Sequence, residues 1–164
     1  MPRVRPVGAS LLLVLLAGCR FAAARPPAEV RLELVGGSNP GLYQASADQP
    51  ACDRDLVGAG SWGVQLTDWK GPKAGLRSLQ LLVPSEQAHD QFYLGLVFGD
   101  FFTGIAREIE TRPASPRPKG HGRVTIEPSP DGATLRIAGV TQDSVAITAT
   151  IACNLPRAEE ESFR

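Results

Sequence analysis

A chain of 164 residues is long enough for one domain with a substantial hydrophobic core, and short for two. It carries 17 basic and 17 acidic residues, so its formal net charge is zero, and the basic residues are dispersed except in one loop. Because nucleic-acid binding requires a concentrated basic surface, nucleic acid is not an expected partner. The 17 glycines and 14 prolines follow no repeat, and this content of turn-forming residues favours a β protein with many turns over a disordered chain.

Residues 1–18 have the features of an export signal. Arg3 and Arg5 precede an apolar stretch over residues 7–18, and no acidic residue occurs before Glu29. This stretch is too short to cross a bilayer, because a membrane-spanning helix needs about 20 apolar residues. A positively charged start, a short apolar core and small residues before a cut are typical of a secretory signal. A buried N-terminal helix of the folded domain is the alternative, and the two arginines fit it poorly.

The segment Leu-Ala-Gly-Cys at residues 16–19 resembles the lipobox of bacterial lipoproteins. The resemblance implies cleavage between Gly18 and Cys19 and attachment of a diacylglycerol to the Cys19 sulfur. An ordinary secretory signal is the alternative, but it would leave an odd thiol at the start of the exported chain. Arg20 stands where the inner-membrane retention signal would place Asp, which favours the outer membrane in a cell that has two. We therefore expect a lipid-anchored protein on the extracytoplasmic side of a cell membrane or outer membrane, with Cys19 as its contact to the membrane.

The other two cysteines, Cys52 and Cys153, are predicted to form one disulfide. An exported domain meets an oxidising compartment, where a cysteine pair persists. The bond would close a loop of about 100 residues, which corresponds to about 4–5 kcal/mol in the chain-entropy description. Zinc binding is the alternative, but neither His89 nor His121 has metal-site spacing to the two cysteines.

Alternating apolar and polar residues predict strands over most of the mature chain. In the segment 144–153, for example, Val145, Ile147, Ala149 and Ile151 share one face, which is typical of a half-buried strand. We expect an all-β domain over residues 29–153, an antiparallel β-sandwich or partly open barrel of about seven to nine strands. The predicted strands are residues 30–35, 61–66, 76–83, 92–98, 102–110, 122–127, 133–139 and 144–153.

The segments around this domain are expected to be a tether and a tail. Residues 19–28 contain Pro26 and Pro27, which favour a stiff, extended chain. Residues 154–164 are polar and acidic and are expected to fray. Inside the domain, residues 85–92 could form a helical turn, and Gly99-Asp100 is predicted as a two-residue turn between strands.

The closing segment, residues 120–153, is similar to the C-terminal half of the mycobacterial 19-kilodalton lipoprotein antigen family. The matching features are Gly120 to Gly122 before a strand, Asp131-Gly132 before the next, the run 137–139, and a last strand that ends in Cys153. The resemblance covers roughly the last fifty residues and the lipobox, and the middle of the chain departs from it. It implies a surface lipoprotein with one cysteine pair, of unsettled function and not an enzyme.

Residues 110–123 form the one concentrated basic segment and are a candidate binding loop. After Glu110 they contain no acid, and three prolines favour an extended conformation that loses little entropy on binding. Near a membrane, such a loop could contact anionic headgroups, an anionic envelope polymer or another envelope protein. The alternative is a solvated connection between strands. The candidate residues are Arg112, Arg117, Lys119, His121 and Arg123.

No catalytic or metal site stands out. His89 lies in a polar segment and His121 between two glycines, no serine occupies a nucleophile-elbow motif, and a catalytic triad could arise only through the fold. We expect no enzyme and no cofactor. Asp53, Asp55 and Asp100 could contribute to a calcium site, but they do not form the dense set of oxygens that calcium requires.

Aromatic residues gather in the middle of the chain, at Phe92, Tyr93, Phe98, Phe101 and Phe102. Alternation places Phe92 and Phe98 in the core, and Tyr93 and Phe102 at the opposite face or at the tip. There they could grip an apolar ligand or another protein, or be covered within the fold. Overall, the residues predict a binding or structural module of the cell envelope. A carrier or sensor with a small apolar ligand in its β-core is one alternative, and a hydrolase is a weaker one.

Overall fold

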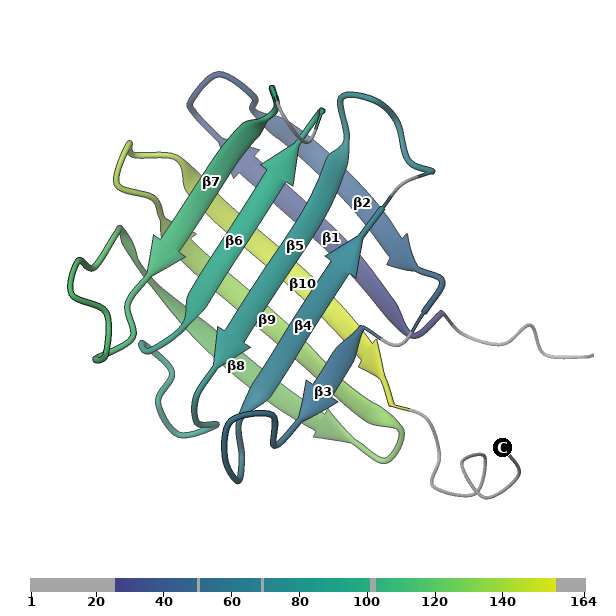
Figure 1. Cartoon of the computed structure of the whole chain (residues 1–164), viewed down its shortest axis with the longest axis vertical. Helices are drawn as coiled ribbons and strands as arrows, with labels where there is room; N and C mark the ends of the chain where they lie inside the picture. Colours follow the sequence, from purple (N-terminus) through teal and green to yellow (C-terminus); the bar gives the residue numbers. More distant parts are fainter. Residues whose placement is uncertain (1–25, 50, 69, 101–102, 156–164) are drawn as a thin grey trace, which may run out of the picture.

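Two antiparallel sheets of five strands each pack face to face in the computed structural model, which describes residues 26–49, 51–68, 70–100 and 103–155 (Figure 1). Sheet A has the order β2-β1-β10-β9-β8, and sheet B has the order β3-β4-β5-β6-β7. Of the two predicted architectures, the sandwich is confirmed. The strands are β1 (Ala28–Val35), β2 (Gly41–Ala47), β3 (Cys52–Arg54), β4 (Trp62–Thr67), β5 (Leu76–Val83), β6 (Tyr93–Phe98), β7 (Ile105–Glu110), β8 (His121–Ser129), β9 (Gly132–Val140) and β10 (Ala146–Asn154).

The core lies between the sheets and consists of the side chains that alternation predicted to face inward. In β1, for example, every second residue is buried and the residues between are exposed. Each fully buried Leu, Ile, Val or Phe side chain contributes roughly 1.5–3 kcal/mol to folding through the hydrophobic effect. The largest fully buried side chains come from both sheets: Trp62, Phe92, Leu34, Leu66, Leu79, Leu94, Leu96, Ile109, Leu135, Ile137, Ile147 and Ile151.

All eight predicted segments contain a strand, and the described residues add two strands that were not predicted, β2 and β3. β2 is a strand at the edge of sheet A, and only its last residue, Ala47, is fully buried. β3 has three residues and pairs with the first half of β4. The prediction therefore missed two strands that each bury a single residue in the core, Ala47 of β2 and Cys52 of β3.

Two local predictions are wrong. Residues 85–92 form successive turns and no helix, with the Ala88 N–H donating to the Ser85 carbonyl and the Gln91 N–H to the Ala88 carbonyl. The strands β6 and β7 are separated by residues 99–104, so Gly99-Asp100 is not a two-residue turn.

The ends of the domain lie side by side in sheet A. β1 begins at Ala28 and β10 ends at Asn154, so the predicted boundaries at 29 and 153 each move by one residue. The Asn154 side-chain amide donates to the Pro26 carbonyl at 2.7 Å, and its backbone N–H donates to the Pro27 carbonyl at 2.9 Å. The predicted signal and most of the tether and tail lie outside the described residues. Within the described part, no helix is long and apolar enough to cross a membrane.

Candidate functional site

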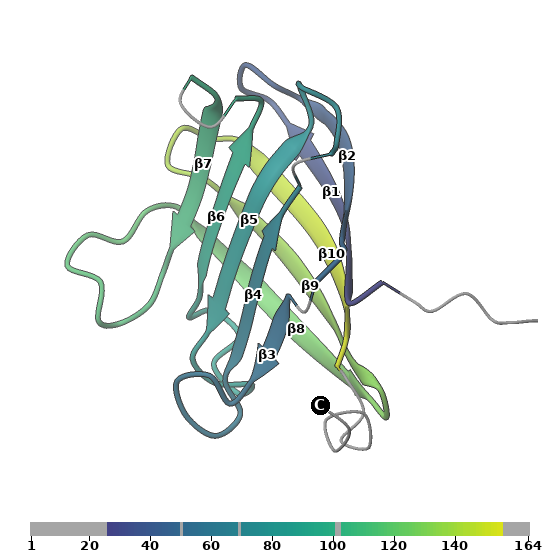
Figure 2. The same cartoon turned by 45° about the vertical axis from the view of Figure 1, so that its right-hand side comes forward.

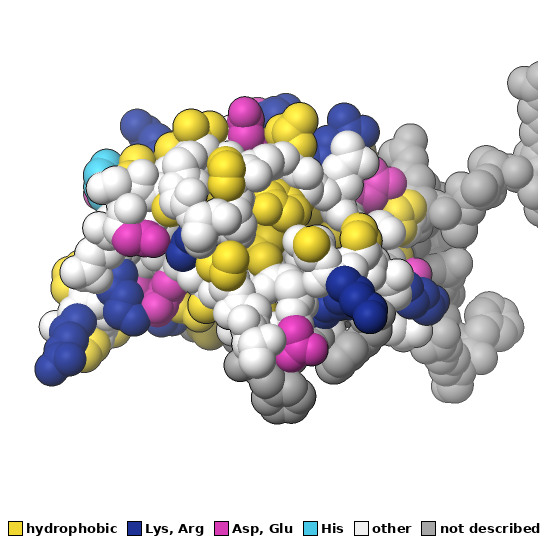
Figure 3. Space-filling model, turned by 90° about the horizontal axis from the view of Figure 1, so that it is seen from above, with side chains coloured by type: hydrophobic (Ala, Val, Ile, Leu, Met, Phe, Trp, Pro, Cys, Tyr) yellow, Lys and Arg dark blue, Asp and Glu magenta, His cyan; other side chains and the backbone are white. Residues whose placement is uncertain are grey.

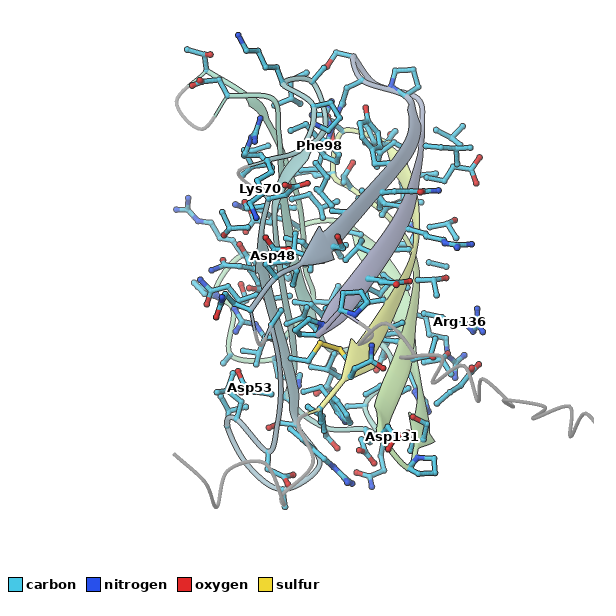
Figure 4. The ribbon with its side chains drawn as sticks, turned by 90° about the vertical axis from the view of Figure 1, so that its right-hand side faces the viewer. Asp48, Asp53, Lys70, Phe98, Asp131 and Arg136 are labelled. Atoms are coloured by element: carbon cyan, nitrogen blue, oxygen red, sulfur yellow. A yellow bond between two sulfur atoms is a disulfide. The ribbon has the colours of Figure 1, made fainter. Side chains whose placement is uncertain are left out.

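The predicted disulfide between Cys52 and Cys153 is present. It joins the first residue of β3 in sheet B to the second-to-last residue of β10 in sheet A, across 101 positions of sequence, with 5.8 Å between the two Cα atoms. Both cysteines are buried, and the bond lies inside the sandwich between the sheets (Figure 4). This bond is therefore a covalent cross-link between the two layers, in addition to the chain connections β2–β3 and β7–β8. The predicted lipid-attachment site, Gly18-Cys19, lies outside the described residues.

The candidate binding loop connects β7 to β8 and projects away from both sheets (Figure 2). Its base is closed by a pair of backbone hydrogen bonds, because the N–H of Glu110 donates to the Lys119 carbonyl and the N–H of Lys119 to the Glu110 carbonyl, each at 2.8 Å. The Arg112 guanidinium bonds the Glu110 carboxylate through two nitrogens, at 2.8 and 2.5 Å. This hydrogen bonding lowers the pKa of Glu110 and raises the pKa of Arg112.

The five candidate residues of this loop do not form one basic surface. Lys119 Nζ pairs with Glu108 Oε2 at 2.6 Å, which raises the pKa of Lys119. Arg117 is exposed near the tip of the loop. His121 and Arg123 are exposed on β8, where alternation directs them to the outer face of sheet A. Two of the four cations are therefore neutralised by acids of β7, and a third faces away from the loop.

The aromatic residues divide as predicted where they are described. Phe92 and Phe98 are buried in the core, and the Phe98 ring lies 4.6 Å from the Tyr43 ring. Tyr93 points to the outer face of sheet B, where its ring covers Gly95: a Cβ at Gly95 would lie 2.5 Å from the Tyr93 hydroxyl oxygen. The Arg112 guanidinium lies 5.2 Å from the Tyr93 ring centre, and burial raises the pKa of Tyr93. Phe101 and Phe102 lie outside the described residues.

The two histidines lie apart. The His89 Nδ1 atom lies 3.1 Å from the Val124 carbonyl oxygen, so this side chain bonds the backbone of β8. His121 is exposed on the same strand. Among the described residues, neither ring hydrogen-bonds to a Ser, Asp or Glu side chain, so no part of a catalytic triad is assembled around them.

The acids suggested for calcium serve as turn residues. Asp55 adopts a φ of 61°, and its carboxylate accepts the Gly60 N–H at 2.6 Å across the connection between β3 and β4. Asp53 is exposed on β3, whereas Asp55 lies just beyond the end of that strand. Asp100 is exposed in the connection between β6 and β7. Within the described ranges, no group of three His, Cys, Asp or Glu side chains could hold a metal ion.

A buried arginine that the sequence did not indicate lies at one end of the sandwich. Arg107 of β7 points inward, and only 11% of its side chain is exposed. Its guanidinium donates to Ser38 Oγ at 3.1 Å and to Asn39 Oδ1 at 2.9 Å, and it pairs with Asp143 at 3.3 Å. The connections β1–β2 and β9–β10 are therefore both held to β7 by one side chain.

The end of the sandwich above Arg107 is chemically mixed. Seen from above, hydrophobic side chains are visible near its centre, with Lys, Arg, Asp and Glu side chains around them (Figure 3). Asp143, the ion-pair partner of Arg107, accepts a hydrogen bond from the Thr141 hydroxyl, which lowers the pKa of its carboxyl. Interspersed charges of both signs favour solubility over recognition of a strongly charged partner.

The surface of the described residues includes three hollows that bear on function. The largest of these three, about 720 Å³, lies where β2 approaches β4 and is lined mainly by polar side chains, among them Asp48, Asp68 and Lys70. A second, about 340 Å³, is lined by residues 29–31 of β1, residues 44–46 of β2 and Asp68. A third, about 290 Å³, lies on the outer face of sheet B between Leu56 and Tyr93. None of these three is lined by Phe92, Leu94 or Leu96, which are buried in the core: Phe92 0%, Leu94 0% and Leu96 1% exposed.

These features define an antiparallel β-sandwich of two five-stranded sheets, linked by one disulfide and carrying surface hollows near its edges. The chain matches no protein-family model, and comparison with curated proteins and with solved structures gives no match.

Proposed function

We propose that this protein is an exported, lipid-anchored β-sandwich that acts as a binding or structural module of the cell envelope, held to the membrane by a lipid on Cys19. The observation that carries the proposal is the Cys52–Cys153 disulfide. A disulfide is typical of a protein in an oxidising compartment, and it leaves Cys19 as the odd cysteine behind a signal-type segment. The resemblance of residues 16–19 to the lipobox supports lipid as the group on that cysteine.

The anchor is tested by expressing the full chain in a bacterium and separating membrane from soluble fractions. We expect the chain in the membrane fraction, cleaved before Cys19, with an intact mass that includes a diacylglycerol. Cys19→Ala should release it or leave it uncleaved without an added lipid. Arg20→Ala is the matched control, because it changes the neighbouring residue and keeps the lipobox. An unchanged mass and unchanged membrane binding in Cys19→Ala would contradict the anchor.

The binding loop is proposed as a contact to anionic envelope surfaces, with Arg117 as its accessible cation. Arg112 and Lys119 are held by Glu110 and Glu108, so their charges are already partly balanced. Arg117→Ala should therefore weaken binding of the full chain to anionic vesicles about fivefold at low salt, because one cation near an anionic surface contributes about 1 kcal/mol. Lys119→Ala should change it less. Equal binding of the wild type and Arg117→Ala at low salt would contradict the proposal and indicate that the loop is a solvated connection between strands.

The two other candidate functions have less support. A carrier would hold its ligand among side chains such as Phe92, Leu94 and Leu96, but these are packed in the core and do not line the hollows described above. A hydrolase would need a histidine poised beside a nucleophile or an acid, and His89 instead bonds a backbone carbonyl. The binding or structural role is therefore the one that the geometry supports best.

A further inference from the structure

The edge strands on the two long sides of the sandwich differ in how their outer backbone groups are hydrogen-bonded. On one side, the edge of β8 is covered: the Val124 N–H donates to the His89 carbonyl at 2.7 Å, and the His89 ring contacts the Val124 carbonyl. The end of β7 is bridged to Lys119 through the two backbone bonds at Glu110. These contacts hinder the addition of a further strand at Val124, in the middle of β8, and at Glu110, the last residue of β7.

The opposite side begins with β2, whose outer edge is directed away from sheet A. The Asn154 N–H donates to the Pro27 carbonyl, so the backbone N–H and carbonyl groups of every second residue after Pro27 in β1 point toward β10. Because backbone groups of successive residues point to opposite sides of a strand, the register of β1 with β2 then decides which residues of β2 face outward. These are Leu42, Gln44 and Ser46. Among the described residues, no backbone or side-chain hydrogen bond reaches their N–H and carbonyl groups from that side.

β4 continues this open side in sheet B. β3 pairs only with the first half of β4, and the last bond between them runs from the Gln65 N–H to the Ala51 carbonyl at 2.8 Å. The same alternation directs the N–H and carbonyl of Thr67 to the open side, since the Asp68 N–H bonds the Arg77 carbonyl of β5. The largest hollow lies here, lined by both β2 and β4 residues, and the second hollow shares Ser46 and Asp68 with it.

The charges along this side are mostly negative. Asp48, Asp53 and Asp68 line the largest hollow together with one cation, Lys70, which pairs with Asp48. The second hollow adds one acid and one cation, Glu29 and Arg31. Figure 4 shows Asp48, Asp53 and Lys70 on the side where the end of β2 approaches sheet B. An occupant that brings positive charge would therefore be attracted to this side, and one that brings negative charge would be repelled.

We propose that the outer edge of β2 is a docking site for an extended, cationic polypeptide segment of another envelope protein, which adds to sheet A as a further strand. This inference rests on the proposed role as a binding module and names its partner. The backbone groups of Leu42, Gln44 and Ser46 supply the hydrogen bonds, and the acids beside β2 select lysine- or arginine-containing segments. A second copy of this chain is disfavoured as the occupant, because pairing β2 with itself would bring the same acids together.

The test uses the full chain in detergent micelles and a fluorescein-labelled nine-residue peptide in which lysine alternates with valine and threonine. Three control peptides are measured beside it by fluorescence anisotropy: one with glutamate in place of lysine, and two N-methylated at one or the other set of alternate backbone nitrogens. At low salt, we expect the lysine peptide to bind at least tenfold more tightly than the glutamate peptide. N-methylation of the set that faces β2 should weaken binding about tenfold, and methylation of the other set should have little effect.

Variants of the chain locate the site. Gln44→Pro removes an N–H from the outer edge of β2 and should weaken binding at least tenfold, whereas Gln44→Ala keeps the N–H and should bind like the wild type. If Gln44→Pro does not fold, Asp53→Asn/Asp68→Asn carries the test, with about tenfold weaker binding expected at low salt. Its matched control is Asp90→Asn/Glu127→Gln, which removes two exposed acids elsewhere.

Three results would overturn the inference. The first is equal binding of the lysine and glutamate peptides. The second is that, in an NMR spectrum of the isotope-labelled protein, the lysine peptide shifts only amide signals of β8. The third is a dimer of this chain that Gln44→Pro dissociates. The last would make a second copy the occupant. Because the peptide experiment does not use the lipid, its failure is distinguishable from failure of the anchor, which the Cys19→Ala fractionation tests separately.

Discussion

Removing the Cys52–Cys153 bond is expected to lower the free energy of unfolding by about 4–5 kcal/mol. The bond spans 101 positions, and closing a loop of that length in the unfolded chain removes about 16 cal/mol/K of entropy, or about 5 kcal/mol at 25 °C. This is a large part of the total stability, since domains of this size are typically stable by about 5–15 kcal/mol. The reduced protein should therefore be close to its limit of folding.

The measurement is urea unfolding of the full chain with and without a reductant that breaks the bond. With a slope of about 2 kcal/mol/M, the midpoint should fall by about 2 M urea on reduction. Cys52→Ala/Cys153→Ala should unfold at least as easily, and reductant should have no effect on it, which controls for other actions of the reductant. A loss below about 1 kcal/mol would refute the reasoning, because the unfolded chain would then not be restrained by the bond as assumed.

The remaining predictions concern single side chains, each measured by urea unfolding. Arg107→Ala should cost about 1–3 kcal/mol, because it leaves the partly buried amide oxygen of Asn39 without its donor, whereas Asp143→Asn, at an exposed position, should lower stability much less. Glu110→Gln should cost about 1–3 kcal/mol near neutral pH. Since hydrogen bonding to Arg112 lowers the pKa of Glu110 below its ordinary value of 4.5, this difference should shrink as the pH falls through the lowered pKa, and a difference that grew in acid would contradict the assignment. Gly132→Ala should cost about 3 kcal/mol, because φ is +149° there and the new Cβ would lie 1.9 Å from the Cys153 carbonyl oxygen.

Alternation predicted the strands that carry the core, and it failed where a strand contributes little to it. The segments later seen as β1 and β10 show a strict two-residue period because one face of each is buried. In β2 the contrast is weaker, since the inward-facing Tyr43 and Ala45 are only partly buried and the apolar Leu42 lies exposed on the outer face. An edge strand of this kind is held by hydrogen bonds to its neighbour, and backbone hydrogen bonds leave no trace in the order of side chains.

The candidate site was predicted in part. The cysteine pair followed from the number of cysteines and the expected compartment, without any knowledge of the fold. The charge balance of the loop could not be predicted in this way. Glu108 and Lys119 come together only because the end of β7 is bridged to Lys119, just before β8. The burial of Arg107 could not be predicted for a related reason, since a charged residue in an alternating strand is expected to face solvent. Its partners Ser38 and Asp143 lie in connections 69 positions before it and 36 positions after it.

The position of the disulfide has a mechanical consequence. Ala28, where the described chain enters β1, pairs with Cys153 on the neighbouring strand, so the cystine stands one strand away from that entry point. Under the proposed anchor, tension on the tether would reach the domain at Ala28 and pass directly through the cystine into sheet B. A pull from the membrane would then load both layers together, and the corner at which sheet A could otherwise be peeled from sheet B is the corner that is covalently closed.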